Sequence, residues 1–150
     1  MRIFDTEGTE LHDTRTSKQE DIVKPVDLAG CYLRKATMEG SFLPDANLKG
    51  ADLRGADLYF SILYRADLSG ADLRDANLCG VDLKESMLKG ADLRNANLGL
   101  NKIGGPAQLQ GACLLGAQLS GAILTGAKYD ARTIFPDGFN PQLAGMLKVG

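Results

Sequence analysis

The sequence has no tryptophan, and aromatic residues make up only 6% of its 150 positions. Because aromatic side chains usually supply much of the buried area of a core, this core must be built from smaller side chains. The sequence also has no large excess of either charge: 17 Lys and Arg stand against 19 Asp and Glu, a formal net charge of −2. This balance argues against a strongly basic nucleic-acid-binding domain and against a strongly acidic imitation of DNA.

The residue patterns of common catalytic and metal sites are lacking as well. The single histidine, His12, lies in a polar flank and is expected to be solvated and inert. No cluster of Cys and His has zinc spacing, and no phosphate-binding glycine loop precedes a helix. The carboxylates of Asp52, Asp72 and Asp92 could hold a cation, but the arginines beside them disfavour it. The sequence therefore predicts no enzyme activity, no metal and no cofactor.

No apolar run approaches the 18 residues that would indicate a membrane span. The acidic start of the chain lacks the apolar core of a secretory signal. Cys31, Cys79 and Cys113 are odd in number and have no CxxC spacing, so we expect free thiols and a cytoplasmic location. We expect Cys31 to point inward and the other two thiols to point outward.

What the sequence has in abundance is a five-residue repeat. Fifteen consecutive units, such as VDLAG, ADLRG and ANLCG, cover residues 26–100. A sixteenth unit, NKIGG, is followed by Pro106 as a single extra residue, and five more units complete the repeat region 26–131. The third residue of a unit is Leu in 18 of the 21 units, and the first residue is always small.

The repeat dictates a chain that turns continually. Residues two apart point to the same side of an extended backbone, so the first and third residues of each unit face inward. The second and fourth residues face outward, and a glycine at the fifth position suits a corner with positive φ. Such a chain must stack on itself to satisfy its backbone groups. The repeat therefore predicts an all-β solenoid.

The pattern A(D/N)LXX over 21 units resembles the pentapeptide-repeat family, which is especially abundant in cyanobacteria. The resemblance implies a right-handed quadrilateral β-helix with four units in each coil, and about five coils in this chain. Adjacent coils are then expected about 4.8 Å apart, the ordinary strand spacing.

The flanks are predicted to be caps, which the open ends of a solenoid need. In the N-terminal flank, residues 1–25, the sequence allows a hairpin-like piece around Gly8 or a helical turn that begins at a capping box in 17–20. In the C-terminal cap, residues 132–150, Asn140 and Pro141 predict a short helix over 141–148. The apolar side chains expected to close the last coil are Phe135, Phe139, Leu143 and Leu147.

One candidate surface is an arginine at the fourth position of one unit in every coil. We call Arg34, Arg54, Arg74 and Arg94 the arginine strip. The neighbouring second positions are Tyr32, Asp52, Asp72 and Asp92. Two interpretations remain open: a self-neutralising ladder of salt bridges, or a strip that binds an acidic partner.

A second candidate surface is a cluster of large apolar residues at outward positions. We call Phe42, Tyr59, Phe60, Ile62 and Tyr64 the aromatic patch. Phe42 and Ile62 are expected in one column, one coil apart, and Phe60 stands at a corner where glycine is usual. Outward aromatics in a chain with few aromatics suggest a contact surface. Three interpretations remain open. A partner protein or a second copy docks on the patch, the N-terminal flank folds over it, or the exposure has no role.

The sequence thus predicts a non-enzymatic, rigid module for protein interaction or regulation, with an unknown protein partner. We expect no direct binding of nucleic acid or membrane, and a monomer or weak homodimer. The family resemblance also implies an alternative, a DNA-mimicking protein that binds topoisomerase (gyrase), as in the quinolone-resistance branch. That branch needs an acidic rod, whereas residues 26–131 carry 12 Asp and Glu against 11 Lys and Arg.

Overall fold

The computed structural model describes residues 2–4, 10–13, 25–100 and 105–150. It contains strands β1 (Arg2–Phe4), β2 (Glu10–Asp13), β3 (Lys128–Tyr129) and β4 (Leu147–Lys148). β1 and β2 pair antiparallel, which agrees with the hairpin-like piece, one of the two alternatives for the N-terminal flank. Gly8 and the capping box at 17–20 lie outside the described residues.

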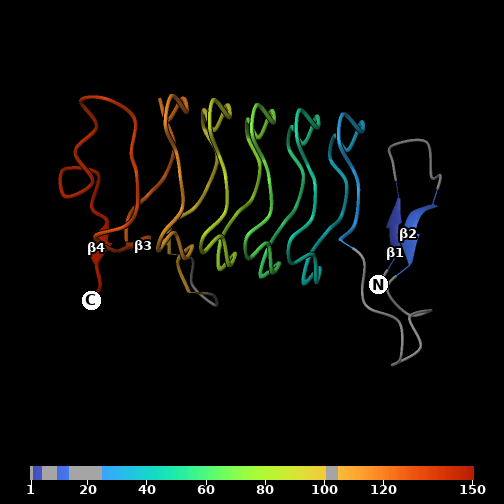
Figure 1. Ribbon diagram of the computed structural model, residues 1–150, viewed down its shortest axis with the longest axis horizontal. Helices are drawn as coiled ribbons and strands as arrows, with labels where there is room; N and C mark the ends of the chain where they lie inside the picture. Colours follow the sequence, from blue (N-terminus) through green and yellow to red (C-terminus); the bar gives the residue numbers. More distant parts are fainter. Residues whose placement is uncertain (1, 5–9, 14–24, 101–104) are drawn as a thin grey trace.

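From residue 26 onward the chain forms a solenoid of stacked coils, and β3 and β4 belong to its last part (Figure 1). Single parallel bridges join residues that are 20 positions apart. The first coil shows four of them, one on each side: Asp27 with Asn47, Tyr32 with Asp52, Thr37 with Asp57, and Phe42 with Ile62. We number the four faces 1 to 4 by these bridges, in chain order. The period of four units therefore makes one coil with four faces.

In the units that carry Asp or Asn at the second position, that side chain stabilises the turn. Its side-chain oxygen accepts a hydrogen bond from the backbone N–H of the fourth residue, as in Asp57 with Tyr59 (3.2 Å) and Asp67 with Ser69 (2.9 Å). This is the Asx turn, in which a short polar side chain mimics a backbone turn. The fifth residue then takes a left-handed conformation, with φ of 63° at Gly55. The motif A(D/N)LXX thus specifies a turn after every two extended residues.

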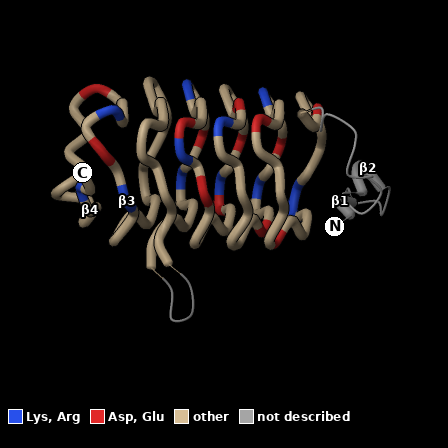
Figure 2. Tube along the Cα trace, turned by 60° about the horizontal axis from the view of Figure 1, so that its bottom comes forward, with Lys and Arg blue, Asp and Glu red and all other residues tan. Residues whose placement is uncertain are grey.

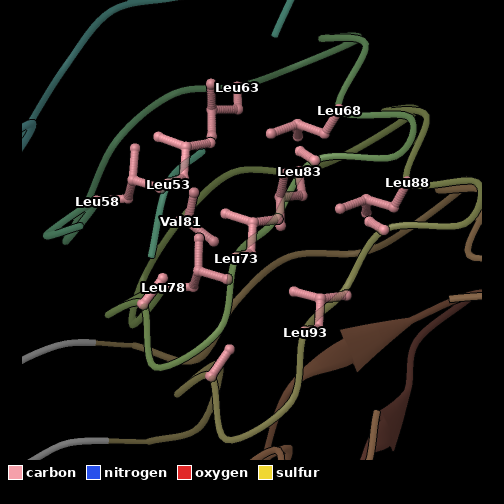
Figure 3. Close-up of a cluster of buried hydrophobic side chains, with 14 of the residues drawn as sticks. Leu53, Leu58, Leu63, Leu68, Leu73, Leu78, Val81, Leu83, Leu88 and Leu93 are labelled. Atoms are coloured by element: carbon pink, nitrogen blue, oxygen red, sulfur yellow. The ribbon is translucent and has the colours of Figure 1, made fainter. Parts of the chain in front are cut away.

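The core consists of the third-position side chains together with the small first-position residues. Leu53, Leu73 and Leu93 are fully buried and follow one another along face 2, and Ala71 beside them is equally buried. Figure 3 shows leucines from successive units meeting in one interior cluster. Burying each such side chain contributes about 1.5–3 kcal/mol before the entropy cost of ordering the chain. A small residue beside each leucine lets the interior fill with few aromatics, and Tyr129 is the one buried aromatic side chain of the described core.

The break near residue 106 differs from the prediction. Asp82 pairs with Gln108, 26 residues later, whereas the spacing before the break is 20. Six residues, 101–106, are therefore additional to the coil, and the prediction of a one-residue insertion at Pro106 was wrong. The stretch NKIGG imitates a unit by its central Ile, so its local sequence does not mark it as additional to the coil.

The predicted helix over 141–148 is also wrong. Residues 141–145 form turns, and β4 pairs in parallel with β3. Asn140 does cap this segment, because its side-chain oxygen accepts hydrogen bonds from the backbone N–H groups of Gln142 (3.0 Å) and Leu143 (3.2 Å). The segment stops after one turn because the N–H of Leu147 donates to the carbonyl of Ala127 (2.9 Å), which extends the ladder instead.

The cap closes the last coil with a different set of side chains from the expected one. Phe135 and Phe139 stack with ring centroids 5.3 Å apart and pack against the core, as expected. Leu143, however, is 88% exposed and Leu147 is half exposed, while Met146 is buried. The β4 pairing turns Met146 inward, so it takes the place that the sequence assigned to the two leucines.

The three cysteines are free, as predicted. Cys79 is buried, which corrects the expectation that it points outward. Its sulfur lies 3.8 Å from the carbonyl oxygen of Asn97, and burial, with a smaller effect of the Asp57 charge, raises the pKa of the thiol. Cys31 and Cys113 are both half-buried. None of the described residues forms a helix of the length and hydropathy needed to cross a bilayer.

Candidate functional site

The aromatic patch lies around the corner between faces 3 and 4. Tyr59 and Phe60 end a unit of face 3, and Phe42, Ile62 and Tyr64 lie on face 4. Phe42 is 57% exposed and Phe60 is 46% exposed, Ile62 is also exposed, and the two tyrosines are half-buried. The bridge between Phe42 and Ile62 confirms that these two residues share a column.

Phe60 has the most unusual position in this patch. Its φ is 53°, in the left-handed region that glycine occupies at most corners. A left-handed backbone costs a non-glycine residue about 1–2 kcal/mol. The Phe60 ring lies over Gly80 in the next coil, where an added Cβ would come within 2.9 Å of it. Tyr59 packs edge-on against the same ring, with centroids 4.6 Å apart. The chain therefore holds an aromatic ring outward at a conformational cost.

Polar contacts border the patch on the far side of face 4. The hydroxyl of Tyr64 donates to a carboxylate oxygen of Glu85 (3.1 Å). The guanidinium carbon of Arg65 lies 5.2 Å from the centroid of the Tyr64 ring, and Arg65 forms a 2.6 Å salt bridge with Asp45. An apolar centre with a polar rim is the usual anatomy of a protein–protein contact.

The arginine strip forms a continuous ladder with the aspartates of face 2. Each carboxylate lies between the arginine of its own unit and the arginine of the preceding coil. The distances are Arg34–Asp52 2.7 Å, Arg54–Asp52 2.6 Å, Arg54–Asp72 3.4 Å, Arg74–Asp72 2.7 Å, Arg74–Asp92 3.6 Å and Arg94–Asp92 2.6 Å. This geometry supports the self-neutralising ladder, because three carboxylates within the protein compensate most of the charge of the four arginines.

The ladder also lowers the pKa of two of its carboxylates. Hydrogen bonds from the Arg74 side chain lower the pKa of Asp72, and those from Arg94 lower the pKa of Asp92. In the part of the chain that the structure describes, no group of three or more His, Cys, Asp or Glu side chains is placed to hold a metal ion. The oxygens of these aspartates bond to guanidinium groups instead.

A third surface, missed by the sequence reasoning, lies at the C-terminal end of the solenoid. No charged residue occurs from Gly105 to Ala127, and this stretch includes the last full coil. Figure 2 shows that coil in tan, between coils that carry blue and red. Leu115 and Ile123 are exposed on it. The length of the charge-free run is the sequence signal that could have revealed this surface. The run contains no aromatic residue that would mark it in another way.

The repeat pattern and the geometry agree with a comparison against family models. The model for pentapeptide repeats matches eight copies, in residues 26–59, 61–99 and 107–128. The chain belongs to the pentapeptide repeat family. The match omits residues 100–106, where the structure places the insertion. A comparison with curated proteins gives no match.

Solved structures of this family are similar to the chain. Rfr23, a pentapeptide repeat protein of the cyanobacterium Cyanothece 51142, is 36% identical, with a TM-score of 0.59 over 77% of this chain and 67% of that one. The pentapeptide repeat protein alr5209 of Nostoc PCC 7120 is 34% identical, with a TM-score of 0.53 over 84% of this chain and 99% of that one. These relatives imply a right-handed β-helix.

A more distant likeness shows the fold alone. QnrB1, a plasmid-mediated fluoroquinolone resistance protein, has a TM-score of 0.63 over 80% of this chain and 68% of its own, but only 16% identity. Its activity therefore does not carry over to this pentapeptide repeat protein.

Proposed function

We propose that this pentapeptide repeat protein is a non-enzymatic, rigid module that binds a partner protein through the aromatic patch. The observation that supports the proposal is the ring of Phe60, held outward at a left-handed corner. Six other described non-glycine residues share this backbone conformation, so it is the large apolar ring exposed at the corner, rather than its φ, that favours a contact role. The polar rim at Tyr64 and Arg65 fits the same role.

The backbone around the patch favours binding without rearrangement. The N–H of Phe60 donates to the carbonyl of Cys79 in the next coil (3.0 Å), and the N–H of Ile62 donates to the carbonyl of Ser41 in the preceding coil (2.7 Å). The patch is thus fixed to coils on both sides. Binding by a preformed surface avoids much of the ordering cost that a flexible segment incurs.

The proposal includes a cytoplasmic location, which the free thiols favour, and a monomer or weak homodimer. DNA mimicry has less support. An imitation of DNA needs a continuous track of negative charge, and the guanidinium groups of Arg54 and Arg74 interrupt the carboxylates of face 2.

A double variant, Tyr59→Ala with Phe60→Ala, tests the proposal. Captured partners from the source cell should bind at least about tenfold more weakly, as expected for hot-spot residues, while the melting temperature stays the same. Leu143→Ala is the matched control, because Leu143 is exposed at the other end of the solenoid. Equal capture by the double variant and the control refutes the proposal.

The same variant distinguishes the alternative in which the N-terminal flank covers the patch. In that case the melting temperature falls and residues 1–25 become sensitive to protease. Unchanged binding, stability and protease sensitivity would instead mean that the exposed aromatics have no role.

A further inference from the structure

The four-sided ladder ends unevenly at the C-terminal end of the solenoid. On face 1 the ladder continues beyond the last full coil, because Cys113 pairs with Ile134. On face 4 it continues through the pairing of β3 with β4. On face 2 the last bridge joins Asp92 to Gln118, and no described residue pairs beyond it. On face 3 the last bridge joins Asn97 to Ile123, and beyond it the corner N–H of Gly126 donates to the carbonyl of Gly145 in the cap (2.8 Å). The cap therefore leaves the edge of face 2 open along its whole length.

The backbone donors and acceptors that the open edge offers follow from the hydrogen bonds between the earlier coils. In the middle of face 2, the N–H of Leu73 donates to the carbonyl of Asp92 in the next coil (2.8 Å), and the N–H of Asp92 donates to the carbonyl of Ala71 (2.9 Å). The N–H of the corner residue Gly55 likewise donates to the carbonyl of Arg74 (2.9 Å). Each unit thus offers two donors and one acceptor to the coil that follows.

In the last coil these three groups lack a partner among the described residues. They are the carbonyl of Ala117, the N–H of Leu119 and the N–H of Gly121. Leu119 is also the one third-position leucine of the described units that is only partly buried. The cap thus leaves both backbone groups and apolar surface of this unit uncovered.

This edge also lacks the usual protection against pairing. Exposed edge strands in natural proteins are commonly blocked by charged side chains or proline. At the corresponding positions one coil earlier, face 2 carries Asp92 and Arg94, but at the edge it carries the neutral, exposed Gln118 and Ser120. The charges disappear in the coil where they would hinder an added strand.

We propose that the edge from Ala117 to Gly121 accepts an extended segment of a partner protein as an additional parallel strand. The segment would place a small residue over Ala117 and, two positions later, a large aliphatic residue over Leu119, as each coil does for the next. Main-chain hydrogen bonds of this kind provide affinity, and alternate side chains provide specificity. This surface is separate from the aromatic patch, so the inference goes beyond the function proposed above.

The occupant is a segment of another polypeptide rather than a second copy of the chain. Two copies that met end to end would bring their caps, residues 132–150, against each other, because Phe135 and Phe139 cover that end. A single extended segment needs only the space beside face 2.

A synthetic peptide that copies residues 91–100, ADLRNANLGL, with blocked termini, is a suitable probe because these units already stack on the last coil from the other side. Hydrogen exchange of the Leu119 and Gly121 amides should slow by about tenfold or more at saturating peptide, since exchange reports the protection of each amide. The amides of Leu73 and Gly55, which are already bonded, should not change. No protection of Leu119 and Gly121 refutes the proposal.

Two modified peptides test the direction of the hydrogen bonds. N-methylation of the residue that copies Asp92 removes the donor for the Ala117 carbonyl, so binding should be lost. N-methylation of the residue that copies Leu93 removes an N–H that faces away from the edge, so binding should remain. Equal binding of the two modified peptides would show that the peptide does not add as a strand in this register.

Variants of the protein test whether the peptide binds at the edge of face 2. In Ser120→Lys the new charge lies next to the peptide residue that copies Arg94, and peptide binding should weaken at least about tenfold, whereas Ser120→Asp should bind no worse than the unmodified protein. Leu115→Lys is the control on the same coil, at a face that Ile134 already closes. Equal loss in Ser120→Lys and Leu115→Lys refutes the edge as the site. If the protein forms a homodimer and Ser120→Lys dissociates it, the occupant of the edge is a second copy of the chain, and the choice of another polypeptide is wrong.

Discussion

Leu73→Ala tests the organisation of the core most directly. Leu73 is fully buried and lies between Leu53 and Leu93 along face 2. Replacing it removes the transfer free energy of the lost carbons and adds a cavity term, which together amount to about 2.7–5.0 kcal/mol when a buried leucine becomes alanine. The low end of that range requires the surroundings to collapse into the cavity.

The backbone ladder opposes such a collapse. The N–H of Leu53 donates to the carbonyl of Asp72, and the N–H of Leu73 donates to that of Asp92, both at 2.8 Å, so these bonds hold the coils apart at strand spacing. We therefore expect the upper half of the range, about 4–5 kcal/mol, in urea unfolding followed by circular dichroism.

Leu143→Ala is the control for the same assay. Its side chain is 88% exposed, so the free energy of unfolding should change by no more than about 0.5 kcal/mol. A loss below about 1 kcal/mol for Leu73→Ala, or equal losses for the two variants, would refute a core made of stacked, non-collapsing leucine layers.

Two further predictions concern the ladder of face 2 and the corner at Phe60. Because arginine hydrogen bonds lower the folded-state pKa of Asp72 and Asp92, their stabilisation is present above the unfolded-state pKa of about 4 and is lost as pH falls through the folded-state value. Acid titrations of the melting temperature should therefore become flatter when both aspartates are replaced by asparagine; an unchanged acid slope contradicts the ladder. Gly80→Ala should destabilise the fold more than Gly50→Ala, because the Cβ added at position 80 would meet the Phe60 ring, whereas the Cβ added at position 50 would meet no atom within 4 Å. The excess should disappear in a Phe60→Gly background, and an excess that persists there would rule out this contact.

The inward and outward sides of the chain could be predicted from the sequence because two positions of every unit repeat with little variation. How deeply an outward residue lies could not be predicted in the same way. Cys79 stands at an outward fourth position but is buried, since a small side chain is covered by its surroundings where Tyr59 or an arginine would extend beyond them. Burial at such positions depends on neighbours one coil away, which the local pattern does not contain.

The ends of the repeat were harder to predict for a related reason. Asn140 and Pro141 carry the local signal of a helix start, and the turn that they predict does form. A ladder bond from Leu147 to Ala127 then outweighs local propensity. Similarly, the open edge at Leu119 depends on which faces the cap pairs with, and no five-residue pattern records that.

The six-residue insertion shows how lengthening of this fold is constrained. After the insertion, Asp92 still pairs with Gln118, so the outward columns keep their alignment along the rod. Adding one extra unit within the winding would rotate every later face by a quarter turn and separate each column from its continuation. Adding four units would lengthen the rod by one coil and leave all columns in phase. An excursion between Leu100 and Ala107 is a third route, since it adds sequence of its own without disturbing the phase. Foreign peptides grafted between these two residues would therefore be displayed on a fixed corner of an otherwise unaltered rod.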